Sequence, residues 1–160
     1  MARQKNDELF MRRAITLSLE NVQNNQGGPF AAVITKDDTI IAEGVNLVTA
    51  THDPTAHAEI IAIRRACQSS SNFQLVGCTM YTTCEPCPMC FGAIYWARLQ
   101  SVIYGNTRID AESIGFDDSF IYDQLAVMPE KRSIPMTQLL HEEAQQAFVL
   151  WQQSQKKIRY

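Results

Sequence analysis

Apolar side chains recur with a helical period near both ends of the chain. The pattern predicts a helix over residues 7–24 and an amphipathic helix over residues 142–157. The repeating face of the first carries Phe10, Ala14, Leu17 and then Asn21 or Val22, and that of the second carries Ala144, Ala147, Phe148 and Trp151. The Gly27-Gly28-Pro29 segment interrupts the first pattern, so we expect the first helix to end before it.

The centre of the chain alternates between strand-like and helix-like patterns. Runs of β-branched and apolar residues predict strands over residues 30–35, 39–45, 78–82 and 101–104. Pro54, after an N-cap at Asp53, and Pro86 each stand where a helix is expected to begin. Residues 106–133 mix aromatic and acidic side chains without a regular period. This order of elements predicts one α/β domain with a mixed sheet over residues 1–160, because no linker or repeat divides the chain.

Composition and charge narrow the class of protein. Hydrophobic residues make up 46% of the 160 positions and charged residues 19%, which is the balance of a folded globular domain. A formal net charge of −3 is opposite in sign to that of most proteins that grip a phosphate backbone, so we do not expect nucleic acid as a partner. The polar N-terminus lacks the apolar stretch of a signal peptide, and no apolar run is long enough for a bilayer. We therefore expect a cytoplasmic protein with no membrane partner.

Two short segments carry the residue types that bind zinc. The odd number of cysteines, five, with three of them between positions 84 and 90, favours metal binding over a disulfide framework. Cys87 and Cys90 are neighbours on one helical turn, and a helix N-terminus lowers the pKa of a thiol toward the thiolate that binds metal. His57 supplies the third ligand of a catalytic site, whose fourth position is left for water. The pattern predicts one zinc ion (Zn2+) per chain.

Glu59 follows the candidate ligand His57 by two positions. Residues two apart do not share a helix face, so Glu59 need not bind the metal and can act on the zinc-activated water. A carboxylate there would take a proton from the water and deliver it to the ring nitrogen and the leaving ammonia. His-x-Glu followed by Pro-Cys-x-x-Cys is the signature of zinc-dependent deaminases of nucleobases.

A purely structural zinc site is the alternative to this interpretation. It requires a fourth protein ligand, for which Cys84 and His52 are the candidates. Cys84 also creates a competing Cys-x-x-Cys spacing with Cys87, but Pro86 favours the helix that carries Cys87 and Cys90. Three protein ligands indicate catalysis, whereas four indicate a structural module.

The chain resembles the cytidine deaminase-like superfamily of zinc deaminases, and within it the bacterial guanine deaminases. The resemblance lies in Gly27-Gly28-Pro29-Phe30, in residues 53–59, 84–90, 92–98 and 115–122, and in the final tyrosine. It covers nearly the whole chain and is least specific between residues 124 and 155. It implies a three-layer α/β/α fold with a five-stranded mixed sheet, a homodimer, and hydrolysis of guanine, a small purine, to xanthine and ammonia.

The resemblance also implies roles for residues outside the zinc site. Substrate contacts are implied for Phe30, Asn46, Ala58, Trp96 and Tyr160, and a second catalytic acid is implied for Asp118. It further implies a domain swap, in which the segment from about residue 125 to 160 crosses to the partner subunit and Tyr160 closes its pocket. Taken alone, Asn46 is an ordinary turn residue, Asp117-Asp118 an acidic turn and Tyr160 a frayed terminus.

Three other activities within the same superfamily stay open at this point. A deaminase of adenosine in transfer RNA shares the zinc motif, although the acidic charge and the Gly-Phe-Asp-Asp sequence at residues 115–118 argue against it. A nucleoside deaminase acting on guanosine, or a triazine deaminase, would use the same metal chemistry. Activity on a panel of such substrates separates these hypotheses.

Overall fold

The computed structural model describes residues 2–159, and the side chains of residues 6–159. Within that range four strands form one mixed sheet in the order β2-β1-β3-β4. The strands are β1 (Ala31–Lys36), β2 (Thr39–Val45), β3 (Cys78–Cys84) and β4 (Ser101–Asn106). β1 runs antiparallel to both β2 and β3, whereas β3 and β4 are parallel. The predicted mixed sheet is confirmed.

The sheet differs from the expectation in its number of strands. The resemblance implied five strands, and the described part of the chain forms four. After β4 the chain forms helix α5 (Arg108–Ser113). Thr107 and Asp110 form a capping box, in which each side chain pairs with the other residue's backbone N–H, and this pairing starts a helix.

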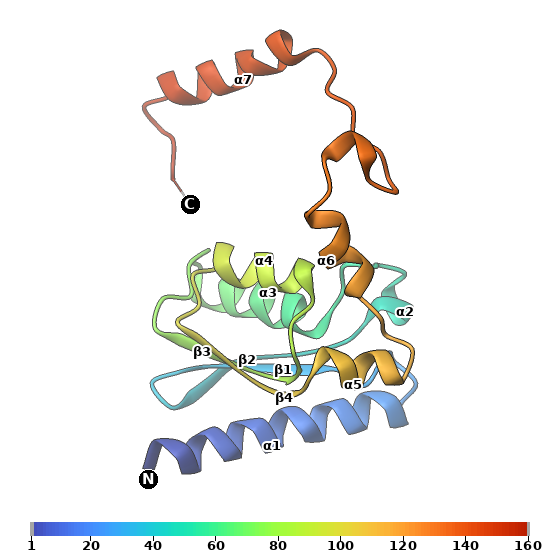
Figure 1. Ribbon diagram of the computed structural model, residues 1–160. Helices are drawn as coiled ribbons and strands as arrows, with labels where there is room; N and C mark the ends of the chain where they lie inside the picture. The colour runs from blue at the N-terminus through green and yellow to red at the C-terminus, as the bar shows by residue number, and fades with distance from the viewer. Residues whose placement is uncertain (1, 160) are drawn as a thin grey trace. The chain divides into compact units, whose positions relative to one another are not determined.

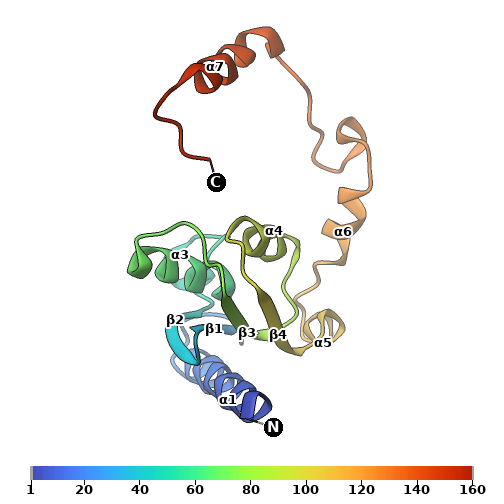
Figure 2. The ribbon, with the colours of Figure 1, turned by 90° about the vertical axis from the view of Figure 1, so that its left-hand side faces the viewer.

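Helices cover both faces of the sheet (Figures 1 and 2). Helix α1 (Ala2–Gln23) lies on one face, and helices α3 (Ala58–Ser70) and α4 (Pro88–Trp96) lie on the other. Successive strand residues point to opposite faces. Val33 and Tyr81 accordingly pack against Phe10 of α1, while Ile34 and Met80 belong to the core beneath α3 and α4. The three-layer α/β/α architecture is confirmed.

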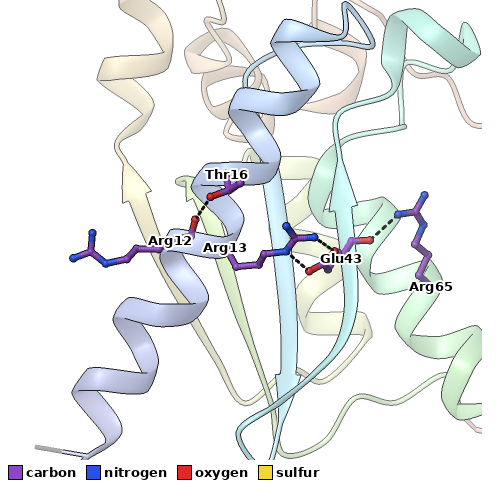
Figure 3. Close-up of polar contacts among 5 residues, drawn as sticks. All are labelled: Arg12, Arg13, Thr16, Glu43 and Arg65. Atoms are coloured by element: carbon purple, nitrogen blue, oxygen red, sulfur yellow. Dashed lines mark hydrogen bonds and ion pairs between the residues drawn. The ribbon is translucent and has the colours of Figure 1, made fainter.

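The edge strand β2 is tied to both helical layers through Glu43 (Figure 3). Arg13 of α1 donates hydrogen bonds of 2.7 and 2.9 Å to the two carboxylate oxygens of Glu43. Arg65 of α3 donates a 2.8 Å hydrogen bond to the backbone carbonyl of the same residue. An arginine pairs with a carboxylate through two parallel hydrogen bonds, which fixes orientation as well as distance. The edge strand β2 is thereby fixed to a helix on each face of the sheet.

Both central helices begin later than the proline positions predicted. α3 starts at Ala58 with His57 as its N-cap, and α4 starts at Pro88 with Cys87 as its N-cap. Asp53 caps a tight turn instead of the helix, because its carboxylate accepts hydrogen bonds from the backbone N–H and the hydroxyl of Thr55 at 2.8 and 2.7 Å. As a result, His57 and Cys87 occupy equivalent positions at the N-termini of two helices on the same face of the sheet.

The chain divides into two compact units, Met1–Asp118 and Ser119–Tyr160. The second consists of α6 (Ser119–Leu125), the short 3-10 helix η1 (Pro129–Lys131) and α7 (His141–Gln153). The predicted C-terminal helix is thus present, ending at Gln153. None of the residues described in these three helices is buried, and Phe148 and Trp151 of α7 are 65% and 47% exposed.

No helix within the described range 2–159 has both the length and the apolar character needed to cross a membrane.

Candidate metal centre and active site

Three candidate metal ligands meet where α3 and α4 begin. His57 comes from the N-cap of α3, Cys87 from the N-cap of α4, and Cys90 from the first turn of α4. The ligand atoms of these three residues all lie within 4.8 Å of one another. His57 Nδ1 is 3.5 Å from the Cys87 sulfur and 3.6 Å from the Cys90 sulfur. The fold therefore brings together the three residues that the sequence motif singled out.

The spacing of these atoms fits a zinc ion. Zinc holds nitrogen at about 2.0–2.1 Å and sulfur at about 2.3 Å in tetrahedral geometry, so a nitrogen and a sulfur on one zinc lie about 3.6 Å apart. Both nitrogen-to-sulfur distances from His57 match this value. The donor set of one imidazole and two thiols is also one that zinc prefers. Three protein ligands leave a fourth tetrahedral position for a reactant.

The two sulfurs differ strongly in acidity although they are neighbours. A hydrogen bond from the Cys90 thiol lowers the pKa of Cys87 to about 4 despite burial, and hydrogen bonding with His57 adds to this. The same hydrogen bond raises the pKa of Cys90. Hydrogen bonding to Cys87 also raises the pKa of His57. A metal ion that takes all three ligands must therefore displace protons from this cluster.

The Glu59 carboxyl group lies against this cluster in the protein interior. Glu59 is 6% exposed, and its Oε2 accepts a 3.5 Å hydrogen bond from the Cys90 thiol. Its Oε1 accepts a 3.3 Å hydrogen bond from the buried hydroxyl of Thr82 on β3. Burial is the main cause that raises the pKa of Glu59. A buried carboxyl group with a raised pKa is suited to exchange a proton with a reactant beside it.

The residues considered as a fourth metal ligand lie outside the cluster. Within the described side chains, the metal-binding group consists of His57, Cys87 and Cys90, without Cys84 or His52. The Cys84 thiol instead donates to the backbone carbonyl of Thr107 at 3.6 Å, and burial raises its pKa to about 11. A neutral thiol of this kind is a poor metal ligand, so the geometry does not support a four-ligand structural site.

Asn46 and Phe30, two of the candidate substrate contacts, lie close together in the first unit. Asn46 is buried, and its Oδ1 accepts hydrogen bonds of 3.3 Å from the backbone N–H groups of Gly28 and Val48. The ring of Phe30 packs edge-on against that of Phe116, with centroids 4.9 Å apart. Phe116 is an aromatic neighbour of the site that sequence reasoning missed, and its only signal was its place in the 115–122 segment.

The remaining candidates differ in how far the structure describes them. Ala58 is fully buried as the first residue of α3. Trp96 ends α4 and is 68% exposed. Tyr160 lies outside the described residues.

Asp118 is half-buried, whereas its neighbour Asp117 is exposed. Burial raises the pKa of Asp118, and the negative charge of Cys87 raises it further. Asp118 in turn is one of the charges that raise the pKa of His57, after the larger effect of the Cys87 hydrogen bond. These mutual influences put Asp118 within electrostatic reach of the candidate metal centre, where a second carboxyl group can exchange protons with a reactant.

The sequence matches a known family over the part of the chain that carries these residues. Residues 4–106 match the family described as the cytidine and deoxycytidylate deaminase zinc-binding region. The chain belongs to this family. It is a zinc-dependent deaminase that uses a single zinc ion, and the described His/Cys/Cys cluster agrees with that cofactor.

Individual relatives of this deaminase cover nearly its whole length. The guanine deaminase of Bacillus subtilis (strain 168) is 51% identical over 97% of this chain and 99% of its own. The crystal structure of guanine deaminase from that organism superposes with a TM-score of 0.93, covering 96% of this chain and 98% of that one.

More distant relatives match a smaller share of the chain. A protein solved in complex with 2,6-diaminopurine is 35% identical, with a TM-score of 0.67 over 70% of this chain and 62% of that one. The tRNA-specific adenosine deaminase of Haemophilus influenzae is 40% identical over 70% of this chain and 68% of its own.

Proposed function

We propose that this deaminase hydrolyses guanine to xanthine and ammonia. The observation that carries the proposal is the buried Glu59 carboxyl group beside the His57, Cys87 and Cys90 cluster. The choice of guanine is supported by the guanine deaminase that matches 97% of the chain, and by the relative that holds 2,6-diaminopurine. The tRNA-specific relative matches 70% of the chain, so guanine is the better supported substrate.

His57, Cys87 and Cys90 are the proposed zinc ligands, and Glu59 is the proposed proton carrier. A zinc ion supplies a hydroxide nucleophile at neutral pH, because it lowers the pKa of bound water to about 7. Glu59 takes the proton that the attacking water loses and delivers it to the ring nitrogen next to the reacting carbon. It then passes the second proton of the former water, from the hydroxyl group now bonded to the reacting carbon, to the amino group, which leaves as ammonia while the ring keeps the oxygen as a carbonyl. The overall reaction consumes one water and releases one ammonia.

The purine is proposed to bind between aromatic side chains with its edge on Asn46. The Oδ1 of Asn46 already accepts from two backbone N–H groups, so its amide nitrogen faces away from them and can donate to a purine acceptor. Phe30, braced by Phe116, and Trp96 would flank the ring, and Ala58 would contact it from the start of α3. Asp118 would exchange a proton with the departing amino group.

A substrate panel tests the proposed function. We expect turnover of guanine to exceed that of guanosine, adenine, cytosine and ammeline, because a pocket with a buried amide strongly rejects rings that do not match its hydrogen bonds. Ammonia release is the measurement, with the Glu59→Ala protein as the blank. Preferred turnover of guanosine would assign a nucleoside deaminase instead. Transfer RNA binding that weakens steeply with salt, together with adenosine deamination, would assign the RNA-directed function.

Asp118→Asn is expected to lower the turnover of guanine by at least about 100-fold, at the lower end of the range of about 10²–10⁴-fold for proton-transfer groups. The matched control is Asp117→Asn, which removes the same charge from an exposed neighbour and should change turnover less than twofold. Steady-state kinetics on both proteins decide the matter. Equal effects of the two substitutions would contradict a catalytic role for Asp118 and would indicate that both residues belong to an acidic turn.

We also propose that the enzyme is a homodimer whose C-terminal segment, from about residue 125 to 160, is exchanged between subunits. The apolar side chains of α7 support this, because none of the residues described in α6, η1 and α7 is buried and such a face needs a surface to cover it. In the proposed arrangement Tyr160 closes the pocket of the partner and excludes water from it.

Deleting residues 158–160 is expected to leave the fold and bound zinc intact but to cost most of the guanine activity. Mixing this deleted protein with the Glu59→Ala protein, after unfolding and refolding them together, should restore activity. In a mixed dimer with exchanged tails, one site has both an intact Glu59 and an intact tail. A deletion protein with full activity, or mixtures that recover none, would contradict the exchange.

We propose the cytoplasm as the place of action and purine breakdown as the context. The five cysteine thiols are all free among the described residues, and a cluster of thiol ligands is maintained in a reducing compartment.

A further inference from the structure

Asn21 carries a buried side-chain amide on the sheet-facing side of α1. It is neither a candidate metal ligand nor a candidate substrate contact. It is 2% exposed and stands where the helical pattern calls for an apolar residue. Its Nδ2 donates to two backbone carbonyls, that of Gly28 at 3.0 Å and that of Asn46 at 2.9 Å. One side chain thus uses its amide nitrogen to join the loop before β1 to the end of β2.

These two backbone segments are pressed together at the point where Asn21 joins them. A Cβ atom placed on Gly27 would lie 2.2 Å from the backbone oxygen of Asn46, so only glycine fits there without displacement. The backbone N–H of Asn46 donates to the carbonyl of Phe30 at 3.0 Å, and its Oδ1 accepts from Gly28. The position of Asn46 relative to Phe30 is therefore set by contacts that Asn21 completes.

One half of the Asn21 side-chain amide, its carbonyl oxygen, lowers the stability of the fold. Within the described side chains its Oδ1 is buried and has no hydrogen-bond partner. An unpaired buried carbonyl oxygen is unfavourable, so such groups are uncommon in folded proteins and call for an explanation. The amide nitrogen of Asn21 explains why this residue is present. It donates hydrogen bonds to two backbone carbonyls at once, which an apolar side chain at this position cannot do.

We propose that Asn21 is a positioning residue for the substrate site, which holds Asn46 and Phe30 at the separation that a purine ring requires. The proposal rests on the proposed function, in which these two residues contact guanine. The hydrogen bonds of the Asn21 amide go to backbone carbonyls at the edge of the site, so it acts through the loops. A loss of alignment of the order of 1 Å at such contacts can reduce reactivity about 100-fold.

Kinetics of Asn21→Ala test the proposal, with Ser18→Ala as the matched control. Ser18 is a buried polar residue of the same helix, and its hydroxyl bonds only to the carbonyl of Ile15 within α1. For zinc-loaded, folded Asn21→Ala we expect kcat/KM for guanine to fall about 10- to 100-fold, mainly through a higher KM. Ser18→Ala should stay within twofold of the original protein. Unchanged KM in folded Asn21→Ala overturns the proposal.

A double-mutant cycle separates positioning from general structural support. If Asn21 acts by placing the Asn46 amide and the loop beside it, Asn21→Ala should cost much less in the Asn46→Ala background than in the original protein. An equal loss in both backgrounds overturns the proposal. Wild-type kinetics in Asn46→Ala alone would instead contradict the role of Asn46 in the proposed function, so the two failures are distinguishable.

A second variant, Gly27→Ala, tests the same loop contact if Asn21→Ala does not fold. Gly27→Ala pushes the two loops apart, because its new Cβ meets the Asn46 carbonyl. We expect the same rise in KM for guanine with zinc content unchanged. A folded Gly27→Ala protein with wild-type KM overturns the proposal.

Discussion

Glu59→Ala is expected to lower kcat for guanine by about 10²–10⁴-fold while zinc remains bound at one ion per chain. The carboxyl group lies beside the three candidate metal ligands and accepts a hydrogen bond from Cys90. Its raised pKa suits proton exchange with a reactant there. It is absent from the cluster of ligand atoms, so its removal should not release the metal. Ammonia release and metal analysis on the same preparation measure both quantities.

Two further variants show whether the proton or the shape of Glu59 matters. Glu59→Gln keeps nearly the same volume but cannot carry the proton, so we expect it to be as inactive as the alanine variant. Glu112→Ala removes an exposed acidic residue of α5 and should leave kcat unchanged. An alanine variant that retains a third of the original turnover would mean that another group moves the proton.

Cys90→Ala is expected to lose most of its zinc and with it nearly all activity. Cys90 is buried, and its sulfur is 3.6 Å from His57 Nδ1, the separation of two ligands on one tetrahedral zinc. With two protein ligands left, the site holds the ion far less tightly. Zinc content after dialysis against a moderate chelator, compared with the original protein, is the measurement.

Cys84→Ala is the matched control for this metal-binding prediction. Cys84 is also buried and lies in the same short segment, but its thiol donates to the Thr107 carbonyl and it does not belong to the cluster. We expect this variant to keep its zinc. Full zinc occupancy in Cys90→Ala, or loss of zinc in Cys84→Ala, would favour the competing Cys-x-x-Cys spacing.

The helices and strands of the first unit were largely predictable because their signals are local. The periods of apolar residues located α1 and all four strands of the described sheet to within a few residues. Helix starts were less predictable, since Asp53 can cap either a helix or a turn, and Thr55 decides for the turn. The fifth strand was implied by the resemblance alone, whereas the apolar and β-branched runs of the sequence predicted the four strands that the described residues form.

The sequence by itself determined the zinc-dependent chemistry that we propose, because His57, Glu59, Cys87 and Cys90 stand in two short motifs whose spacing suits a metal site at helix N-termini. Only the tertiary structure decided what surrounds that chemistry. Thr82 reaches Glu59 from β3, and Asn21 reaches the Gly28 and Asn46 carbonyls from α1. Such contacts join residues far apart in the chain, and a pattern of neighbouring side chains contains no information about where separate elements meet.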